Sequence, residues 1–404
     1  MKICYCTRLL PYEDNFYEKY KKYGFVVSSH KYIMNQLEGF DLNDFLNIQA
    51  INVPDIGSYP KFPKIFFQET VRKDTGRIHA FDIGFINIPV LKQFFQNRVV
   101  TKNVFRWVKE NQRDKIVLMS YSINPTFIRP LLKVRKKFPT VKICLVVGDL
   151  WGTEGVDQHN KGLKKFLVDK FMGDGTSLAR QADMFIFVAD AMAKALNVSE
   201  KPYLIIEGIN NYGISNSCIT VEETEEKTVF YAGNLDQQFG VLHLLDAFEL
   251  IPNKNYRLIL AGGGDSDNII REHVKLDSRI RFLGYVSPET VREIQSKATV
   301  LVNPRRNIGT YTKYSFPSKT MECLASGKPY VAYKLSGIPN EYDDFIQYVE
   351  GELPEDFAEK IVQICELPLQ ERLSIGLKGK EFIAANKNPK ALGRKTMEFL
   401  ERNI

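Results

Sequence analysis

Short runs of apolar and β-branched residues alternate with longer segments of helical periodicity along most of the 404 residues. This alternation is typical of βαβ units, which build parallel sheets. A first series of apolar runs predicts strands at 2–7, 115–122, 141–149, 184–190 and 202–208. A second series predicts strands at 228–234, 256–264, 280–286, 299–304 and 328–333. We therefore predict an α/β protein with two separate parallel sheets.

A polar segment separates the two series of strands. Residues 215–227 include a cluster of four glutamates and continue neither pattern, so we interpret them as a linker. The sequence thus predicts an N-terminal domain over 1–214 and a C-terminal domain over 228–389. The last segment, 390–404, has the apolar stripe of a helix that could pack on either domain.

The segment 10–110 is the least regular part of the chain. It holds many aromatic residues and several prolines, and few of its apolar positions follow a clean period. We expect loops there, with a short helix or a hairpin.

The overall composition is that of an ordinary globular protein. Apolar residues make up 44% and charged residues 25%, which excludes collagen-like, disordered and coiled-coil proteins. The six cysteines and five histidines are scattered without the spacing of a disulfide framework or a metal site, so we predict no metal. No apolar stretch approaches the roughly 20 residues of a membrane span or resembles a signal peptide, and we expect a cytoplasmic protein with reduced thiols.

The net charge of +7 is unevenly distributed. Residues 51–150 hold 18 basic and 7 acidic side chains, whereas residues 201–404 hold 25 basic and 28 acidic ones. A basic N-terminal half favours an anionic partner such as a membrane surface, a lipid pyrophosphate or a nucleic acid, and of these we predict a membrane surface and no nucleic acid. The alternative is a solvated lysine-rich surface. Candidate contributors are Lys133, Arg135, Lys136 and Lys137.

Small and polar residues end the strands of the second series. Gly233 and Asn234 follow one strand, Gly263 lies in a run of three glycines after the next, and Tyr285 follows Gly284 after the third. Ligands of open α/β sheets bind at the carboxyl ends of strands, where glycine lets a backbone approach closely. These positions are therefore candidate ligand contacts, although tight turns alone also explain the glycines.

The segment 314–332 leads through a turn into a predicted helix. Amide groups at Ser318, Lys319 and Thr320 could hold a diphosphate, and Lys319 could add a charged contact. Glu322, one turn further, could accept hydrogen bonds from a ribose diol. The alternative is that Ser318 caps the helix and Glu322 complements its dipole.

Five segments together resemble retaining GT-B glycosyltransferases of family four. They are GNLDQQFGVLHLLDAF (233–248), LILAGGGDSD (258–267), IRFLGYVSPE (280–289), MECLASGKPYVA (321–332) and GIPNEY (337–342). The N-terminal half is similar only loosely, through VVGDLWG (146–152) and ARQADMFIFVAD (179–190). The resemblance implies two Rossmann-like domains that face each other across a cleft. It further implies that the second domain binds a nucleotide sugar and that the final helix crosses back to the first.

The resemblance also assigns residues, and some of them depart from the family's pattern. In the family's pattern two glutamates lie eight residues apart; Glu322 matches the second, which binds ribose, whereas Tyr314 stands in place of the first. Asn234 and Phe239 stand where the family usually has an arginine and a lysine that contact the diphosphate. Either other cations have taken over this role, or the chain is not catalytic. The candidate cations flank the same predicted strand ends and are Arg305, Arg306, Lys313 and Lys319.

The resemblance further implies a donor or acceptor contact for Asp149, which ends a strand of the first series; the alternative is a helix cap. Asp265, Ser266 and Asp267 spell the DxD sequence of metal-dependent glycosyltransferases with a different fold. We interpret that match as a coincidence in a polar loop.

Together these observations predict that the protein transfers a sugar from a nucleotide-diphosphate sugar. We expect uridine as the base, retention of configuration and no metal ion. The acceptor would be a glycan, glycolipid or glycoprotein, no cofactor is required, and the protein would lie in the cytoplasm or on the inner face of the membrane. A silent sugar-binding or partner-binding subunit and a nucleotide-sugar epimerase stay open, as does a homo-oligomer. Predicted catalytic residues are Arg305, Lys319 and Asp149. Predicted binding residues are Gly233, Asn234, Gly263, Tyr285, Ser318, Thr320 and Glu322.

Overall fold

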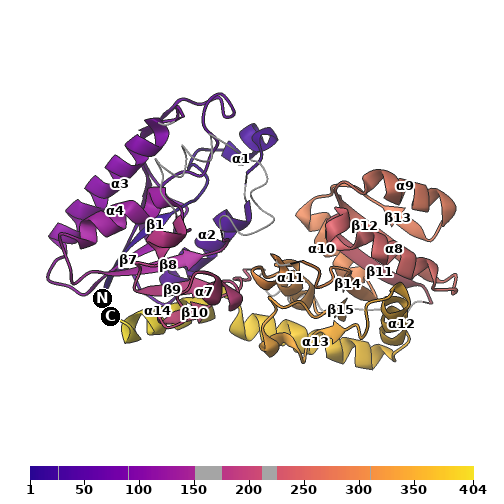
Figure 1. The fold of residues 1–404 in the computed structure, drawn as a ribbon. Helices are drawn as coiled ribbons and strands as arrows, with labels where there is room; N and C mark the ends of the chain where they lie inside the picture. Colours follow the sequence, from indigo (N-terminus) through magenta and orange to yellow (C-terminus); the bar gives the residue numbers. More distant parts are fainter. Residues whose placement is uncertain (26, 90, 151–174, 212–224, 310) are drawn as a thin grey trace. The chain divides into compact units, whose positions relative to one another are not determined.

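The computed structural model describes the chain except for residues 26, 90, 151–174, 212–224 and 310. The chain forms two compact units (Figure 1). The first unit comprises Met1–Asn211, Lys313–Ser315 and Asn388–Ile404, and the second comprises Tyr212–Thr312 and Phe316–Lys387. Most of the expected linker, 215–227, lies outside the described residues.

The first unit contains an eight-stranded sheet in the order β10-β9-β8-β7-β1-β2-β5-β4. All neighbouring strands are parallel except β4 and β5. The strands are β1 (Lys2–Thr7), β2 (Ile48–Asn52), β4 (Thr70–Val71), β5 (His79–Asp82), β7 (Ile116–Tyr121), β8 (Lys142–Val147), β9 (Met184–Phe187) and β10 (Tyr203–Ile205). A separate antiparallel pair joins β3 (Phe66–Phe67) to β6 (Phe85–Ile86).

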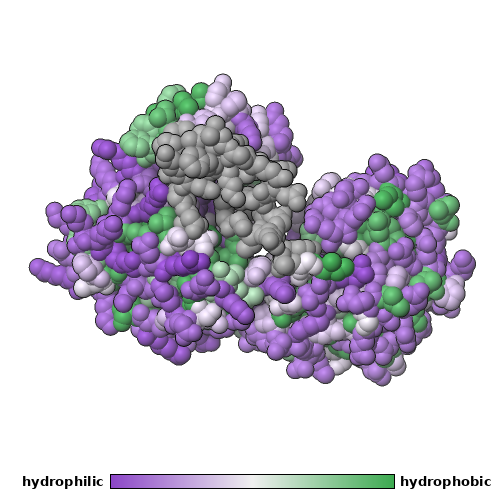
Figure 2. Space-filling view, in the orientation of Figure 1, coloured by the Kyte–Doolittle hydropathy of each residue, from purple (hydrophilic) through white to green (hydrophobic). Residues whose placement is uncertain are grey.

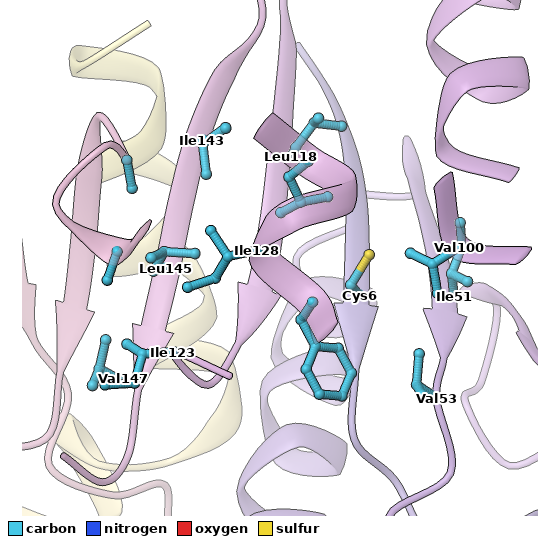
Figure 3. Packing of buried hydrophobic residues seen from close by; sticks show 14 of the residues in the cluster. Cys6, Ile51, Val53, Val100, Leu118, Ile123, Ile128, Ile143, Leu145 and Val147 are labelled. Carbon is cyan, nitrogen blue, oxygen red and sulfur yellow. The ribbon is translucent and has the colours of Figure 1, made fainter. Parts of the chain in front are cut away.

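Helices cover both faces of this sheet, because side chains alternate along each buried strand. Cys4 and Cys6 of β1 point into a core with α3 (Leu91–Glu110) and α4 (Pro125–Arg135), part of which is drawn in Figure 3. Ile3 and Tyr5 point into the opposite core. That core is closed by α2 (Val27–Leu42) and α14 (Pro389–Arg402). Shorter helices are α1 (Phe16–Tyr20), α6 (Gly175–Ala179) and α7 (Ala191–Ala195).

The C-terminal helix α14 packs closely on α2. Gly39 and Gly393 meet at the crossing, where a Cβ atom on either glycine would collide with the backbone of the other helix. The side-chain amide of Asn43 donates to the Lys390 carbonyl at 2.8 Å. Leu392 and Leu400 of α14 are buried in the core of the first unit. The last residues of the chain therefore complete a core whose first strand lies at the N-terminus.

The expectation of loops and one short element over 10–110 is wrong. The structure has two long helices there, of 16 and 20 residues, and three strands of the main sheet, β2, β4 and β5. Several buried positions of the helices are polar, including Gln36, Gln96 and Asn103. Polar residues at core positions weaken the apolar period from which helices are predicted.

The second unit contains a six-stranded, fully parallel sheet in the order β13-β12-β11-β14-β15-β16. Its strands are β11 (Lys227–Asn234), β12 (Tyr256–Gly263), β13 (Ile280–Phe282), β14 (Val300–Asn303), β15 (Tyr330–Ala332) and β16 (Gln347–Tyr348). The helices on its two faces are α8 (Val241–Glu249), α9 (Asp267–Leu276), α10 (Pro288–Lys297), α11 (Lys319–Ala325), α12 (Pro354–Cys365) and α13 (Leu369–Asn386). The predicted α/β class is confirmed. Among the described helices, none combines the length and apolar character needed to cross a bilayer.

Candidate functional site

A pocket of about 360 Å³ opens at the carboxyl ends of two strands in the second unit. It brings together five residues singled out in the sequence, although they lie up to 86 positions apart: Gly233, Asn234, Gly263, Tyr285 and Lys319. The rest of the lining is small or apolar and consists of Ala232, Ala261, Gly262, Val286 and Val291. Parallel strands β11 and β12 supply its floor, because their carboxyl ends meet at one edge of the sheet.

Glycines in this floor allow backbone segments and the Tyr285 ring to approach more closely than a Cβ atom would permit. Gly262 has a φ of +130° and lies so close to Gly233 that a Cβ atom would collide with the Gly233 carbonyl oxygen. A Cβ atom on Gly263 would run into the ring of Tyr285. The Tyr285 side chain therefore rests against bare backbone, while 84% of the residue stays exposed. An aromatic ring in this position offers a flat, accessible face at the edge of the pocket.

Aspartates in the loops after β11 and β12 accept hydrogen bonds from backbone amides of these loops, next to the pocket floor. The Asp265 carboxylate accepts from the Gln237 amide at 2.8 Å, and Asp236 accepts from the Asp265 amide at 2.9 Å. Asp267 accepts from the Gly264 amide at 2.9 Å. The DxD match is thus used for hydrogen bonds within the loops. The described residues contain no group of three or more side chains suited to hold a metal ion.

Lys319 is the cation of the pocket, and it forms an ion pair with Glu322. Its ammonium lies 2.6 Å from a Glu322 carboxylate oxygen, one helical turn along α11. The two side chains are 41% and 22% exposed, so solvent reaches both. Such a partly exposed pair contributes little to stability and is easily exchanged for another partner. Lys319 and Glu322 can therefore both turn to a ligand.

The prediction for Thr320 is not supported by its surroundings. Thr320 is fully buried, its amide donates to the Pro317 carbonyl at 2.8 Å, and its hydroxyl pairs with that of Tyr330 at 3.1 Å. The hydroxyl bond joins α11 to β15, the amide bond closes the turn before the helix, and neither the amide nor the hydroxyl of Thr320 faces a ligand. Ser318 precedes α11 as an exposed residue, and its side chain makes no capping hydrogen bond.

Arg305 does not line the pocket and is not a surface residue. It is 9% exposed, and its guanidinium carbon lies 5.5 Å from the centre of the Phe239 ring. The loops that carry these two residues are in tight contact, because a Cβ atom on Gly240 would collide with the Pro304 carbonyl oxygen. Arg305 therefore places a positive charge next to the loop in which Phe239 replaces an expected lysine. Arg305 itself follows β14, the strand that neighbours β11.

Tyr314, which replaces an expected glutamate, belongs to the first unit together with Lys313. Its ring packs against the apolar core of that unit and is partly buried. The structure therefore gives this position a packing role.

Asp149 follows β8 at the carboxyl edge of the first sheet. Burial raises the pKa of its carboxyl, and the nearby charge of Arg8 opposes this rise. Arg8 in turn pairs with Asp55 at 2.6 Å. Arg8 was missed by the sequence analysis, although it directly follows β1 and could have been found by examining strand ends in the first series as well. Trp151 and Gly152, which complete the VVGDLWG motif, lie outside the described residues.

Part of the second unit is similar to known glycosyltransferases. Residues 226–366 match the family model described as "Glycosyl transferases group 1". An uncharacterized glycosyltransferase of Methanocaldococcus jannaschii is 25% identical over 120 residues, which are 29% of each chain. The chain spans less than a third of the length of the curated relatives it matches.

Solved structures resemble the whole chain. The lipopolysaccharide outer core galactosyltransferase WaaB is covered completely, with a TM-score of 0.65 and 15% identity. HepE of Anabaena, solved in complex with UDP, is also covered completely, with a TM-score of 0.63 and 13% identity. At such low identity these likenesses establish the fold alone. The chain has the GT-B fold with two Rossmann-like domains, and the pocket lies within the segment that matches the glycosyl transferase group 1 model.

Proposed function

We propose that this protein transfers a sugar from a nucleotide-diphosphate sugar to an acceptor, and that the pocket of the second unit binds the donor. The observation that carries the proposal is the convergence of Lys319, a glycine floor and the exposed Tyr285 ring in one pocket. This pocket lies inside the glycosyl transferase match. A diphosphate needs cations and close backbone approach, and a base needs a flat apolar surface.

The chemistry follows from the charges at this site. Departure of the sugar leaves an additional negative charge on the diphosphate, which must be stabilised in the transition state. Lys319 supplies a positive charge in the pocket, and Arg305 supplies a second one next to Phe239. We propose that these two cations replace the pair missing at Asn234 and Phe239. The reaction would proceed with retention of configuration and without a metal ion.

Uridine is the proposed base, and Glu322 is the proposed ribose contact. UDP is bound in the structural neighbour HepE, which makes it the first nucleotide to test. The acceptor would be a glycan, glycolipid or glycoprotein, with Asp149 among its candidate contacts. We further propose a cytoplasmic protein that associates with an anionic membrane surface.

A panel of nucleotides and nucleotide sugars, measured by thermal shift and calorimetry, tests the proposal. UDP and at least one UDP-sugar should bind, and 2′-deoxy-UDP should bind more weakly. Glu322→Gln should reduce the preference for UDP over the deoxy compound, because a neutral amide is a weaker acceptor than a carboxylate. Glu272→Gln is the matched control, since Glu272 also pairs with a lysine three residues away on a helix of this unit.

Product analysis then separates the alternatives. Release of UDP with formation of a glycosidic bond supports the proposal, and one-dimensional NMR of the product reports the anomeric configuration. Binding without turnover across a panel of acceptors would favour the silent subunit. Conversion of the sugar without an acceptor would favour the epimerase.

A further inference from the structure

The exposed side of α3, the end of α4 and the residues that directly follow α4 contribute cations and large apolar side chains to one surface. Figure 1 shows the two helices side by side on one face of the first sheet. We call this surface the basic–aromatic face. Its residues are Leu91, Phe94, Arg98, Lys102, Phe105, Lys109, Lys133, Lys136, Lys137 and Phe138.

The apolar part of this face is exposed although the helix has a well-packed opposite side. Leu91, Phe94 and Phe105 are 44%, 61% and 38% exposed, whereas Val100 and Val104 on the other side of α3 are completely buried. Leu91, Phe94 and Phe105 follow a spacing of three and eleven residues, which keeps them on one side of the helix. Large apolar side chains gathered on a surface mark a site of interaction.

Two further exposed apolar residues come from segments next to α3. Ile88 precedes the helix and is 37% exposed, and Phe66 of the neighbouring β3–β6 pair is 67% exposed. In Figure 2, hydrophobic residues gather at the top left of the first unit, above a surface that is mostly hydrophilic. Aliphatic side chains such as Leu91 and Ile88 cannot stack on nucleic acid bases, so this composition favours a hydrocarbon environment.

The cations of the face are available to a partner. Within the described residues, Arg98, Lys102, Lys109, Lys136 and Lys137 form no ion pair with a carboxylate. They are all exposed. A surface of this charge attracts an anionic one, and salt screens the attraction.

Two contacts join the residues that α4 and the segment after it contribute to this face with those of α3. Lys133 donates to the Asn97 side chain at 3.1 Å, and the rings of Phe105 and Phe138 lie 5.3 Å apart. Arg135, which the sequence analysis grouped with its neighbours, is instead partly buried and pairs with Asp183 at 3.0 Å. It does not belong to the face.

We infer that the basic–aromatic face docks on an anionic lipid bilayer. The lysines and arginines would meet the lipid phosphates, while Phe94, Leu91 and Phe105 enter the interfacial layer, where aromatic and aliphatic side chains partition favourably. This inference deepens the proposed membrane association by naming the surface responsible, and it does not depend on the proposed sugar transfer.

Vesicle sedimentation with the full chain tests the inference. Vesicles of phosphatidylcholine with one third phosphatidylglycerol should bind the protein, whereas pure phosphatidylcholine vesicles should bind it weakly. Reversal of four cations, in the variant K102E/K109E/K136E/K137E, should weaken binding to anionic vesicles by at least about 100-fold, since each cation near such a surface contributes several-fold. Phe94→Ser should weaken binding by about tenfold, also at the salt concentration that screens the charges.

A matched control distinguishes a loss of binding caused by this face from one caused by the change in net charge. The variant K254E/K378E/R394E/K395E changes the net charge by the same amount at exposed positions without an ion pair among the described residues. It should bind anionic vesicles much more tightly than the first variant. Circular dichroism and the UDP-induced thermal shift, which report on folding and on the donor pocket, should be unchanged in both.

Equal vesicle binding by the two charge variants would overturn the inference, and so would absence of binding by the native chain at low salt. Tight binding of a labelled single-stranded oligonucleotide, lost in K102E/K109E/K136E/K137E while vesicles are not bound, would assign the face to nucleic acid instead. Failure of UDP to bind would refute the proposed donor pocket and leave the vesicle result intact.

Discussion

Removal of the Lys319 ammonium should lower turnover strongly and leave the fold almost unchanged. In Lys319→Ala the ion pair with Glu322 is lost, but both partners are partly exposed, and such pairs contribute only about 0.5 kcal/mol or less. The free energy of unfolding should therefore change little. Donor affinity should also change modestly, because Lys319 must give up Glu322 when it binds a diphosphate.

The effect on the chemical step is larger. A unit of new charge on the leaving diphosphate at about 4 Å from the ammonium gains roughly 4 kcal/mol at an effective dielectric constant of about 20. Loss of one positioned donor in comparable sites costs about 10²–10³-fold in rate. We therefore expect the turnover number of Lys319→Ala to fall by at least ~10²-fold, with a smaller change in the KM for the donor.

The assay is release of UDP from the best donor and acceptor under saturating conditions. Lys275→Ala is the matched control, because Lys275 pairs with Glu272 at 2.7 Å across the same helical spacing but does not line the pocket. It should turn over at the native rate. Turnover of Lys319→Ala at the native rate would refute the assigned role, whereas recovery of activity on adding Asn234→Arg would show that a cation is what the site requires.

Three further predictions concern other parts of the second unit. Tyr285→Ala should weaken UDP binding by about 1–2 kcal/mol in calorimetry, because a stacked base loses its aromatic partner. Tyr285→Phe keeps the ring and should bind UDP as the native chain does, so an equal loss of affinity in both variants would exclude stacking. Gly262→Ala should reduce the free energy of unfolding in urea by more than about 2 kcal/mol, since φ is +130° and the methyl group meets backbone. Gly284→Ala, with φ at +65° and open space, should cost only about 1 kcal/mol, and similar losses would contradict the packing argument. Burial lowers the pKa of His243, so the folded state disfavours the protonated ring, and stability should fall as the pH decreases below the unfolded pKa of about 6.5. The decrease in Tm from pH 8 to about pH 5.5 should be smaller in His243→Gln, and an identical decrease would assign the pH dependence to other groups.

Most strands of the two sheets could be predicted from the sequence, because they are short apolar runs that end in glycine or a polar residue, whereas β2, β4, β5 and β16 were not predicted. β11 and β12 are examples, since each ends in the glycines that now form the pocket floor. α2 and α3 could not be predicted in the same way. Their buried sides include Gln36 and Lys92, whose hydrogen bonds to Tyr5 and to the Ile56 carbonyl appear only once the chain is folded.

The candidate site could be predicted to the extent that it depends on strand ends. Lys319 and Tyr285 lie in one pocket because helices and loops that follow parallel strands gather at one edge of the sheet. Sequence alone could not tell which side of the short helix α11 is buried, and Thr320 was therefore assigned to a ligand although it bonds to Tyr330. The position of Arg305 over Phe239 depends on the packing of two loops far apart in the sequence.

The position of α14 has a consequence for the order in which the protein folds during synthesis. Nearly all of the second unit is translated between the bulk of the first unit and the helix that closes its core. The second unit can therefore fold on the ribosome while Ile33, Leu37 and Phe40 of α2 still lack their packing partners on α14. A nascent chain whose α14 has not yet left the ribosome should expose this apolar surface to chaperones, and premature termination within α14 should destabilise the unit that was synthesised first.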